Sequence, residues 1–354
     1  MRRIGVLTGG GDAPGLNAVI RALVKHLSAN SVEVIGFRDG FRGLVLGASR
    51  VLDMNAISGI LPRGGTILGT SNRDNPFEFQ GQDRLADCLK NVQELGVESV
   101  VVIGGDGSLA ISTECYRRGL PTVGVPKTID NDLEATDQTF GFDTAVNTAT
   151  EALDRLHTTA ESHHRVMVLE VMGRYAGWIA LASGIAGGAD AILIPEIPFR
   201  FETVANRILQ RKAAGRSFSI IVVAEGAKMP DGNLVVARTV AGSHDPIRLG
   251  GIGHLIAARM EDLTGLEARV TILGHVQRGG SPTPYDRILA TRYGVAAADL
   301  ALGRVYGHMV ALRGTSVIPV PFSEAVGKMR AVPIDGELMQ TARGVGITFG
   351  DETD

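Results

Sequence analysis

The chain contains repeated short apolar runs, each of which ends in glycine or in polar residues. Ile4 to Leu7, Val100 to Ile103 and Pro121 to Val125 are examples. Runs of about four to eight apolar residues bounded by turn signals are typical of strands buried on both faces of a parallel sheet. Segments with helical spacing of apolar residues alternate with these runs, as at Leu16 to Leu27. The alternation predicts an α/β fold with mostly parallel sheets.

Length and composition limit the function classes to consider. The 354 residues suffice for two domains of ordinary size or one large one, and a net charge of −3 gives no basic footprint for nucleic acid. Cys88 and Cys115 have neither metal nor redox spacing, which is typical of a reduced intracellular protein. No apolar run reaches the roughly 18 residues that span a membrane, and the N-terminus lacks a signal-peptide core. We therefore expect a cytoplasmic protein without nucleic-acid or membrane partners.

The first strand is followed by a glycine-rich turn, Thr8 to Gly15, and then by a helix. Backbone N–H groups converge at such a junction, and the helix dipole favours an anion there. Gly9 and Gly11 nearly fit the dinucleotide-binding fingerprint, but Pro14 stands where the third glycine should be, and no Gly-Lys-Ser/Thr follows. The turn therefore predicts a phosphate site of another kind, with a tight turn that binds no ligand as the alternative.

A second glycine-rich turn carries a carboxylate. Val100 to Ile103 ends in Gly104-Gly-Asp-Gly-Ser108, and we expect a helix from Leu109. Mg²⁺ favours one or two carboxylates together with substrate oxygens. Asp106 is therefore a candidate for binding magnesium and phosphate.

A third strand end, Pro126 to Asp132, holds the densest group of candidate catalytic residues. Its sequence is Pro-Lys-Thr-Ile-Asp-Asn-Asp, so Lys127 and Thr128 precede two carboxylates, Asp130 and Asp132. Loops at the carboxyl ends of strands in open α/β sheets are where ligands bind. One of the carboxylates can take a proton while the other holds a metal. A solvated Asp-Asn turn is the structural alternative, because these residues are common in turns.

Arginines recur beside strand ends and glycines. Arg73 follows a glycine loop, and further arginines of this kind are Arg165, Arg174, Arg269 and Arg278. The guanidinium group binds phosphate through two parallel hydrogen bonds. Each arginine taken alone is expected on the surface. Together they suit two phosphate-bearing ligands, a donor and an acceptor.

These segments, in this order, resemble the phosphofructokinase family. The motifs that carry the resemblance are Leu7–Asn17, Gly104–Ser108, Pro126–Asp132, Met172–Arg174 and Gly274–Gly280. Gly-Gly-Asp-Gly alone is weak evidence, because NAD kinases and lipid kinases carry a similar run, but the Thr-Ile-Asp stretch is specific. The resemblance implies a phosphofructokinase fold of two Rossmann-like three-layer domains. It also implies transfer of a phosphoryl group to the 1-hydroxyl of fructose 6-phosphate.

The domain division is likewise implied by the resemblance. A phosphoryl-donor domain would comprise residues 1–141 and 254–304, and a fructose 6-phosphate domain would comprise residues 142–253 and 305–354. The latter includes a C-terminal extension, for which we expect a final helix from Asp335 and to which we assign no function.

By position in these motifs, Asp130 is implied as the general base that accepts the proton of the sugar hydroxyl. Thr128 and Asp132 would flank it on substrate and metal, and Lys127 would neutralise a phosphate. Arg174 would stabilise the transferring group or bind sugar.

The donor and its Mg²⁺ are implied to bind at the glycine loops, with Asp106 on the metal. The further residues implied for the donor are Gly11, Arg73, Gly105, Gly107 and Ser108. The residues implied for fructose 6-phosphate are Arg165, Met172, Gly173, Glu225, Arg269, His275 and Arg278. In the family, the counterparts of Arg165 and Arg269 reach into a neighbouring subunit's site, so a homodimer or homotetramer is implied.

Two positions bear on whether the donor is ATP or pyrophosphate. Members of the family that use pyrophosphate typically carry Asp where this chain has Gly107, and a carboxylate there would crowd the α-phosphate of a nucleotide. Lys127 is more typical of pyrophosphate users, although some ATP users have it too. A glycine permits the nucleotide and a lysine does not forbid it, so we expect ATP, with pyrophosphate as the alternative.

Two other classes of function compete with this interpretation. A nicotinamide-dependent dehydrogenase is suggested by the first glycine loop, but Pro14 argues against it. A non-catalytic sensor of nucleotide or sugar phosphate would have no need of a general base, so the presence of Asp130 argues against that function.

Overall fold

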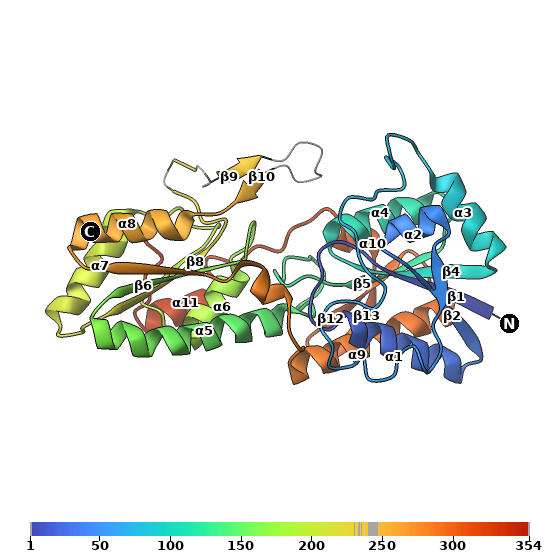
Figure 1. Cartoon of the computed structure of the whole chain (residues 1–354), viewed down its shortest axis with the longest axis horizontal. Coiled ribbons are helices and arrows are strands. Elements are labelled where there is room, and N and C mark those ends of the chain that lie inside the picture. Colours follow the sequence, from blue (N-terminus) through green and yellow to red (C-terminus); the bar gives the residue numbers. More distant parts are fainter. Residues whose placement is uncertain (1, 230, 233, 235, 240–246, 353–354) are drawn as a thin grey trace. The chain divides into compact units, whose positions relative to one another are not determined.

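The computed structural model describes residues 2–229, 231–232, 234, 236–239 and 247–352, which fall into two compact units (Figure 1). The first unit comprises Met1–Ile129, Leu133–Thr144 and Arg278–Met329. The second comprises Asp130–Asp132, Ala145–Gln277 and Arg330–Asp354. Among the described residues, no helix combines the length and the apolar character that crossing a bilayer requires.

The first unit contains a mixed set of strands and helices. In chain order they are β1 (Arg2–Thr8), α1 (Leu16–Ala29), β2 (Val32–Phe37), α2 (Phe41–Leu46), β3 (Ser49–Val51), α3 (Leu85–Glu94), β4 (Val97–Gly104), α4 (Asp106–Arg117), β5 (Thr122–Pro126), α9 (Pro284–Leu302), β12 (His308–Arg313), β13 (Ser316–Pro321) and α10 (Phe322–Ala325). The strands form one sheet of order β13-β12-β5-β4-β1-β2-β3. The inner pairs are parallel, whereas the edge strands β3 and β13 are antiparallel to their neighbours.

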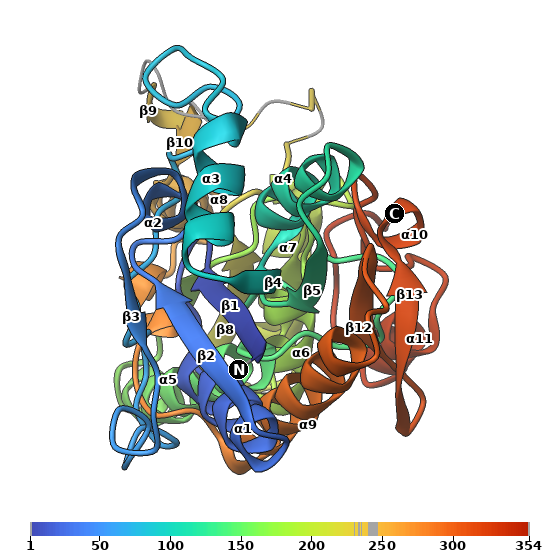
Figure 2. The same cartoon turned by 90° about the vertical axis from the view of Figure 1, so that its right-hand side faces the viewer.

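Helices cover both faces of this sheet, which explains why its inner strands are apolar throughout. Val101 and Ile103 of β4 pack in one core with α1 and α9, which lie together beneath the sheet in Figure 2. Val100 and Val102 point to the other face and pack in a second core with α3 and α4. Successive side chains of a strand alternate between faces, so both sets must be apolar.

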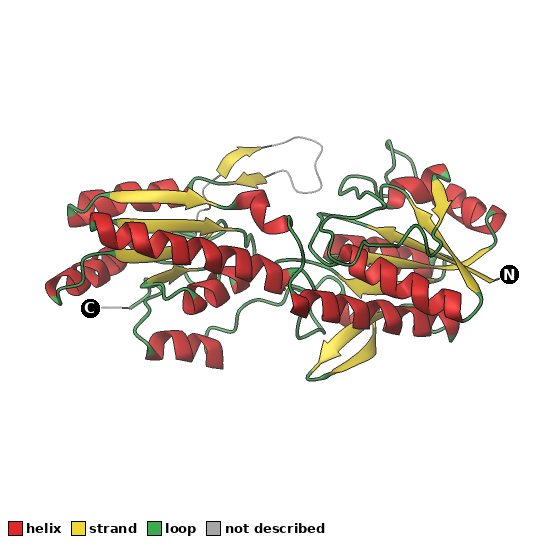
Figure 3. Ribbon diagram, turned by 60° about the horizontal axis from the view of Figure 1, so that its bottom comes forward, coloured by secondary structure: helices red, strands yellow, loops and turns green. Residues whose placement is uncertain are grey.

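The second unit is also layered, with helices beside its strands in Figure 3. Its elements are α5 (Phe142–His163, which begins in the first unit), β6 (Val166–Val171), α6 (Trp178–Ala186), β7 (Ala191–Leu193), α7 (Phe201–Ala213), β8 (Ser219–Ala224), β9 (Val236–Thr239), β10 (Ile247–Leu249), α8 (Ile252–Thr264), β11 (Ala268–Ile272), the 3₁₀ helix η1 (Gly274–Arg278) and α11 (Glu337–Gly344). The main sheet has the order β11-β6-β8-β7 and is parallel, and β9 and β10 form an antiparallel pair.

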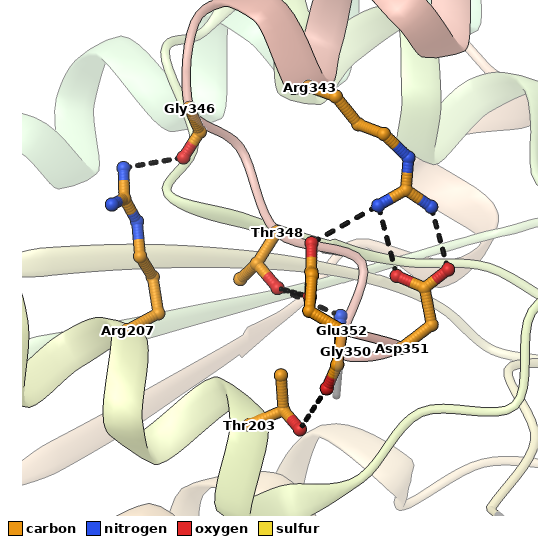
Figure 4. Close-up of polar contacts among 8 residues, drawn as sticks. All are labelled: Thr203, Arg207, Arg343, Gly346, Thr348, Gly350, Asp351 and Glu352. Carbon is orange, nitrogen blue, oxygen red and sulfur yellow. Dashed lines mark hydrogen bonds and ion pairs between the residues drawn. The ribbon is translucent and has the colours of Figure 1, made fainter. Parts of the chain in front are cut away.

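The C-terminal extension lies along one edge of this second sheet, and Figure 4 shows the hydrogen bonds and ion pairs that hold this segment. After α11 the chain runs beside β7, where Thr348 pairs with Ala191 and its carbonyl accepts the N–H of Ile192 at 2.9 Å. Arg343 holds the segment through Asp351, at 2.7 and 3.0 Å. An edge strand that is paired in this way has fewer free backbone groups to offer to another chain.

The α/β class with mostly parallel sheets is confirmed, but several expected boundaries differ. We expected the first unit to regain the chain at residue 254 and to lose it after residue 304. Instead it holds Arg278–Met329, because β11 pairs with β6 of the second unit, whereas β12 pairs with β5 of the first. The final helix begins at Glu337 rather than Asp335.

Candidate active site

The first glycine loop owes its composition to close approaches of neighbouring atoms. The N–H of Gly9 donates to the carbonyl of Ile103 at 2.9 Å, and the hydroxyl of Thr70 donates to the carbonyl of Gly10 at 2.6 Å. A Cβ atom at Gly9 would lie 2.5 Å from the hydroxyl oxygen of Ser108. The ends of β1 and β4 are therefore in direct contact, and only glycine fits between them.

The second glycine loop is shorter than the sequence predicted, because α4 begins at Asp106 rather than at Leu109. Gly105 is the N-cap residue, and the N–H of Leu109 already bonds to its carbonyl at 3.0 Å. Asp106, Gly107 and Ser108 therefore form the first helical turn, whose N–H groups lack intrahelical partners. The helix start was not predicted at Asp106, because the helix propensity of the neighbouring glycines is low. The Asp106 carboxylate therefore lies in the first turn of α4, at the helix end that favours anions.

Lys127 joins the two glycine loops. Its side chain is only 3% exposed, and its ammonium group donates to the carbonyl of Gly11. Its main-chain N–H donates to the carbonyl of Gly104 at 3.0 Å, which continues the pairing of β5 with β4. A buried cation thus lies between the loops that follow β1 and β4, which suits a polyphosphate.

Two arginines expected at the ligands differ in their surroundings. Arg73 is exposed, and its main-chain N–H donates to the hydroxyl of Ser71 at 3.3 Å. Arg278 belongs to the first unit, where its guanidinium group donates to the carbonyl of Asp12 at 3.3 Å and lies against Gly11. We expected Arg278 at the sugar phosphate; within its own unit it lies beside the glycine loop.

The start of α4 also has open space and an exposed carboxylate. A Cβ atom at Gly107 would meet nothing within 4 Å. Asp106 is exposed, and one of its carboxylate oxygens accepts the N–H of Gly327 at 2.9 Å. The described residues contain no group of three or more His, Cys, Asp or Glu side chains that could form a complete metal site. A carboxylate beside a glycine loop fits Mg²⁺, which takes most of its ligands from substrate and water.

The Thr-Ile-Asp stretch is divided between the units: Thr128 belongs to the first, and Asp130–Asp132 to the second. The carbonyl of Thr128 accepts the hydroxyl of Thr139 at 2.7 Å. Asn131 has a φ of 53°, a left-handed conformation that turns the chain sharply between the carboxylates. Both Asp130 and Asp132 are partly buried.

Arg330 and Trp178 support this turn, and neither was among the residues expected at the site. The main-chain N–H of Arg330 donates to the carbonyl of Asp132 at 2.9 Å. Its guanidinium group lies 4.4 Å from the centre of the Trp178 ring, and the indole N–H donates to the carbonyl of Arg330 at 2.8 Å. Contacts between residues so distant in sequence leave no local pattern to read.

In the second unit, several residues expected at the sugar phosphate follow adjacent parallel strands. Met172–Arg174 follows β6, Glu225 follows β8, and His275 lies in η1 after β11. The N–H of Glu225 donates to Val171 at 2.9 Å, and the N–H of Gly226 donates to Gly173 at 3.1 Å. The carboxyl ends of parallel neighbours meet at one edge of a sheet, so these residues share that edge.

Close packing fixes the turn that bears Arg174. A Cβ atom at Gly226 would lie 1.9 Å from the carbonyl oxygen of Arg174, and Gly173 has a φ of 133°. The guanidinium group of Arg174 lies 5.0 Å from the ring centre of Tyr175.

Arg165 and Arg269 lie at the amino ends of β6 and β11, whereas the residues around Arg174 follow the carboxyl ends. Arg165 immediately precedes β6, and Arg269 is the second residue of β11. Both bind Glu267, Arg165 at 2.6 Å. A strand of this length spans about 20 Å. Within one chain these arginines therefore do not join the residues around Arg174.

A buried carboxyl group, Asp286, fixes the start of α5 and was not among the expected site residues. It accepts the N–H of Gly141 at 2.9 Å and both the N–H and the hydroxyl of Thr144, at 2.8 and 2.5 Å. Burial raises its pKa to about 6, against the effect of these hydrogen bonds.

The spacing Thr283-x-x-Asp286 resembles a capping box, and this signal could have indicated the start of α9, whose N-cap residue is Thr283.

Comparisons with known proteins agree with this architecture. The parallel sheets and the glycine- and arginine-bearing strand ends define an α/β protein suited to phosphate ligands. The family model described as Phosphofructokinase matches residues 3–301. The chain belongs to the phosphofructokinase family.

Relatives in this family are named for two different donors. A protein of Chloroflexus aurantiacus named ATP-dependent 6-phosphofructokinase is 54% identical, over 99% of this chain and 98% of its own. A protein of Streptomyces coelicolor named pyrophosphate–fructose 6-phosphate 1-phosphotransferase is 53% identical, over 98% of this chain and 100% of its own. Identity alone therefore does not separate the donors.

A solved structure supports the fold. Phosphofructokinase from Saccharomyces cerevisiae superposes with a TM-score of 0.79 at 32% identity, covering 92% of this chain. This chain spans 45% of that longer one.

Proposed function

We propose that this chain transfers the γ-phosphoryl group of ATP to the 1-hydroxyl of fructose 6-phosphate, giving fructose 1,6-bisphosphate. The observation that carries the proposal is the convergence of Gly11, Ser108 and the buried Lys127 at the ends of β1, β4 and β5. Phosphoryl transfer requires little beyond positioning and charge neutralisation, and this arrangement supplies backbone donors, a helix start and a cation.

The first unit would hold the donor. Gly11, Gly105, Gly107 and Ser108 offer close backbone approach and the unpaired N–H groups of the first turn of α4, while Lys127 offsets phosphate charge. Arg73 would add a flexible cation. When bound, Mg²⁺ would neutralise charge on the donor phosphates, with Asp106 as its protein ligand.

The Thr-Ile-Asp stretch would supply the base. Asp130 would accept the proton of the sugar 1-hydroxyl as the oxygen attacks phosphorus. Thr128 and Asp132 would flank it, with the left-handed residue Asn131 between the two carboxylates. Arg174 would stabilise charge on the transferring group.

The sugar phosphate would bind at the second unit. Met172, Gly173, Glu225 and His275 belong to one edge of its sheet, and they would contact the ring hydroxyls and phosphate. Arg278, held beside Gly11 in the first unit, would contribute a further cation. Because fructose 6-phosphate and ATP are both charged metabolites, we further propose that the enzyme works in the cytoplasm.

The opposite position of Arg165 and Arg269 supports an oligomer with shared sites. They lie about one strand length from Met172–Arg174 in the same chain, so a role at fructose 6-phosphate requires a second copy. We propose a homodimer or homotetramer in which these arginines serve the neighbouring subunit. In mixtures, Arg269→Ala chains combined with Asp130→Ser chains would regain activity that neither has alone.

Pyrophosphate is the second candidate donor. It is favoured by Lys127 and by the 53% identical relative named for that donor, whereas the open space at Gly107 favours ATP. The test compares initial rates with ATP and with pyrophosphate on fructose 6-phosphate, at equal magnesium, with aldolase coupling. We expect ATP to give the higher kcat/KM; a higher value with pyrophosphate would reverse the donor, and no rate with either would remove the proposed function.

A further inference from the structure

Gln277 is a buried amide within an otherwise exposed turn. It lies in η1, where His275 is exposed and Val276 is 65% exposed, yet the Gln277 side chain has no exposed surface. A polar side chain turned inward at such a place must find hydrogen-bond partners, because burying an unpaired amide is costly. Its partners therefore indicate what the residue does.

The amide of Gln277 bonds two main-chain groups from different elements. Its Oε1 atom accepts the N–H of Met172 at 2.7 Å, and its Nε2 atom donates to the carbonyl of Ala145 at 3.3 Å. Met172 is the first residue after β6, and Ala145 lies near the start of α5. One partner is a donor and the other an acceptor, a pair that a neutral amide satisfies simultaneously.

The side chain continues the hydrogen bonding of the sheet beyond the end of β11. The N–H of Leu273 still donates to Glu170 at 3.0 Å. β11 is then followed by η1, so no main-chain carbonyl of β11 accepts the next N–H of the β6 segment that faces it, which is that of Met172. The side-chain oxygen of Gln277 accepts this N–H instead. The strand end bearing the Met-Gly-Arg turn is thus held on the β11 side by a single side chain.

On the other side, β8 holds the same turn. The N–H of Gly226 donates to Gly173 at 3.1 Å, and the approach of Gly226 to the carbonyl of Arg174 leaves no room for a Cβ atom. Gln277 therefore completes a two-sided clamp on Met172–Arg174. Because it belongs to the same turn as His275, it couples both groups of proposed sugar-phosphate contacts.

We propose that Gln277 is a positioning residue for fructose 6-phosphate, which fixes the Met172–Arg174 turn and the His275 turn relative to the start of α5. This inference rests on the proposed function. Gln277 itself contacts no substrate; it acts through main-chain bonds to residues that do. Its loss displaces sugar-phosphate contacts and leaves the glycine loops of the first unit intact.

The test compares Gln277→Met with a matched control, Asn17→Leu. Asn17 is also a buried amide with main-chain partners: it donates to Arg63 and Gly64 and accepts from Ile67, all in the first unit. Both substitutions remove buried hydrogen bonds by replacing an amide with an apolar side chain of similar size. Each variant is assayed for KM with fructose 6-phosphate, affinity for a non-hydrolysable ATP analogue, and urea midpoint.

We expect Gln277→Met to raise the KM for fructose 6-phosphate by about tenfold, the scale of one lost hydrogen bond to a buried group. Its affinity for the ATP analogue should stay within about twofold of the wild-type value, because the glycine loops of the first unit are unchanged. Asn17→Leu should lower the urea midpoint comparably without this rise in KM. Equal sugar KM values for Gln277→Met and the wild type would overturn the proposal. Should Gln277→Met not fold, Gln277→Ala also lacks the acceptor for the Met172 N–H, adds no bulk and carries the same comparison.

Hydrogen exchange separates this inference from the proposed function. Loss of the Gln277 acceptor should accelerate exchange of the Met172 N–H in the variant, while exchange there is unchanged in Asn17→Leu. A wild type without activity on fructose 6-phosphate would remove the proposed function, and exchange at Met172 would still decide whether Gln277 holds the turn. Unchanged exchange in Gln277→Met would overturn the positioning role.

Discussion

The first and second units present their strand ends in different ways. In the first, the turns after β1 and β4 consist largely of glycine, and they lie so close together that a Cβ atom at Gly9 would reach the Ser108 hydroxyl. In the second, the turns after β6, β8 and β11 carry Arg174, Glu225 and His275. The same parallel architecture therefore offers backbone donors in one unit and charged side chains in the other.

The difference follows from what each turn must exclude or admit. Glycines let a polyphosphate reach main-chain N–H groups and the start of α4, where the helix dipole assists. Charged side chains need support instead, because their positions depend on rotamers that must be fixed by neighbours. The second unit supplies it through Gln277 and through Gly226, which packs on the Arg174 backbone.

The largest expected effect is on catalysis and concerns Asp130–Asp132, a segment of the second unit whose neighbours in sequence belong to the first. Asp130→Ser should lower kcat by roughly 10²–10⁴-fold, the usual contribution of a general base, with little change in the KM for fructose 6-phosphate. Steady-state kinetics with ATP measure this. Asp154→Ser, at an exposed position of α5, is the control and should behave as the wild type. A kcat unchanged in Asp130→Ser would remove the base role.

The next effect tests how tightly the second unit holds its turn. Gly226→Ala would place a Cβ atom 1.9 Å from the Arg174 carbonyl oxygen, so the backbone must move. We expect a loss of about 3 kcal/mol or more in the free energy of unfolding, or no folded protein. Gly344→Ala is the control: a Cβ atom there meets nothing within 4 Å, and the helix should gain up to about 1 kcal/mol. Equal urea midpoints for the two variants would contradict the clamp on Met172–Arg174.

A pH effect should come from the first unit, where the carboxyl of Asp286 is buried. Burial raises its pKa from 3.8 to about 6. Between these values the folded chain keeps a proton that the unfolded chain has released. The stability that Asp286 contributes is therefore full below pH 4 and is lost as the pH rises towards 6, by about 3 kcal/mol.

The measurement is the difference in unfolding free energy between the wild type and Asp286→Asn, followed by urea titration from pH 4 to pH 7. The asparagine does not titrate, so other carboxyl groups cancel in the difference. A difference that is independent of pH would show that Asp286 is ionised throughout this range.

The smallest effect concerns the donor. Gly107→Asp should leave stability within about 0.5 kcal/mol of the wild type, because the position is exposed and open. It should lower kcat/KM for ATP by about tenfold, since the new carboxylate repels the nucleotide phosphates, and affect pyrophosphate less. A uniform loss with both donors would mean that Gly107 serves the phosphate loop in general and does not select the donor.

Local patterns in the sequence were enough to predict much of the fold. The apolar run Val100–Ile103 lies in β4 as expected, and the Leu16–Leu27 periodicity marks α1, because buried strands and amphipathic helices leave distinct spacings. The start of α4 was missed, since Gly105 and Gly107 favour a loop by local propensity while the surrounding structure imposes a helix.

In the candidate site, too, local motifs could be recognised in the sequence, whereas contacts between distant residues could not. The motif predicts that Lys127 lies near phosphates, whereas its bond to Gly11, more than a hundred positions away, could not be predicted. The clamp by Gln277 and the support of Asp132 by Arg330 likewise join residues far apart in sequence. Such pairings depend on strand order, which composition and periodicity leave undetermined.

The segment that runs beside β7 has a practical consequence for handling the protein. Ile192 and Asp190 of the second unit engage the main chain of Thr348, so the carboxyl-terminal residues act as the outermost ribbon of a sheet. Proteolytic removal or displacement of this segment would expose unpaired main-chain N–H and C=O groups along β7. The protein would then be prone to aggregate by strand pairing or to form domain-swapped dimers.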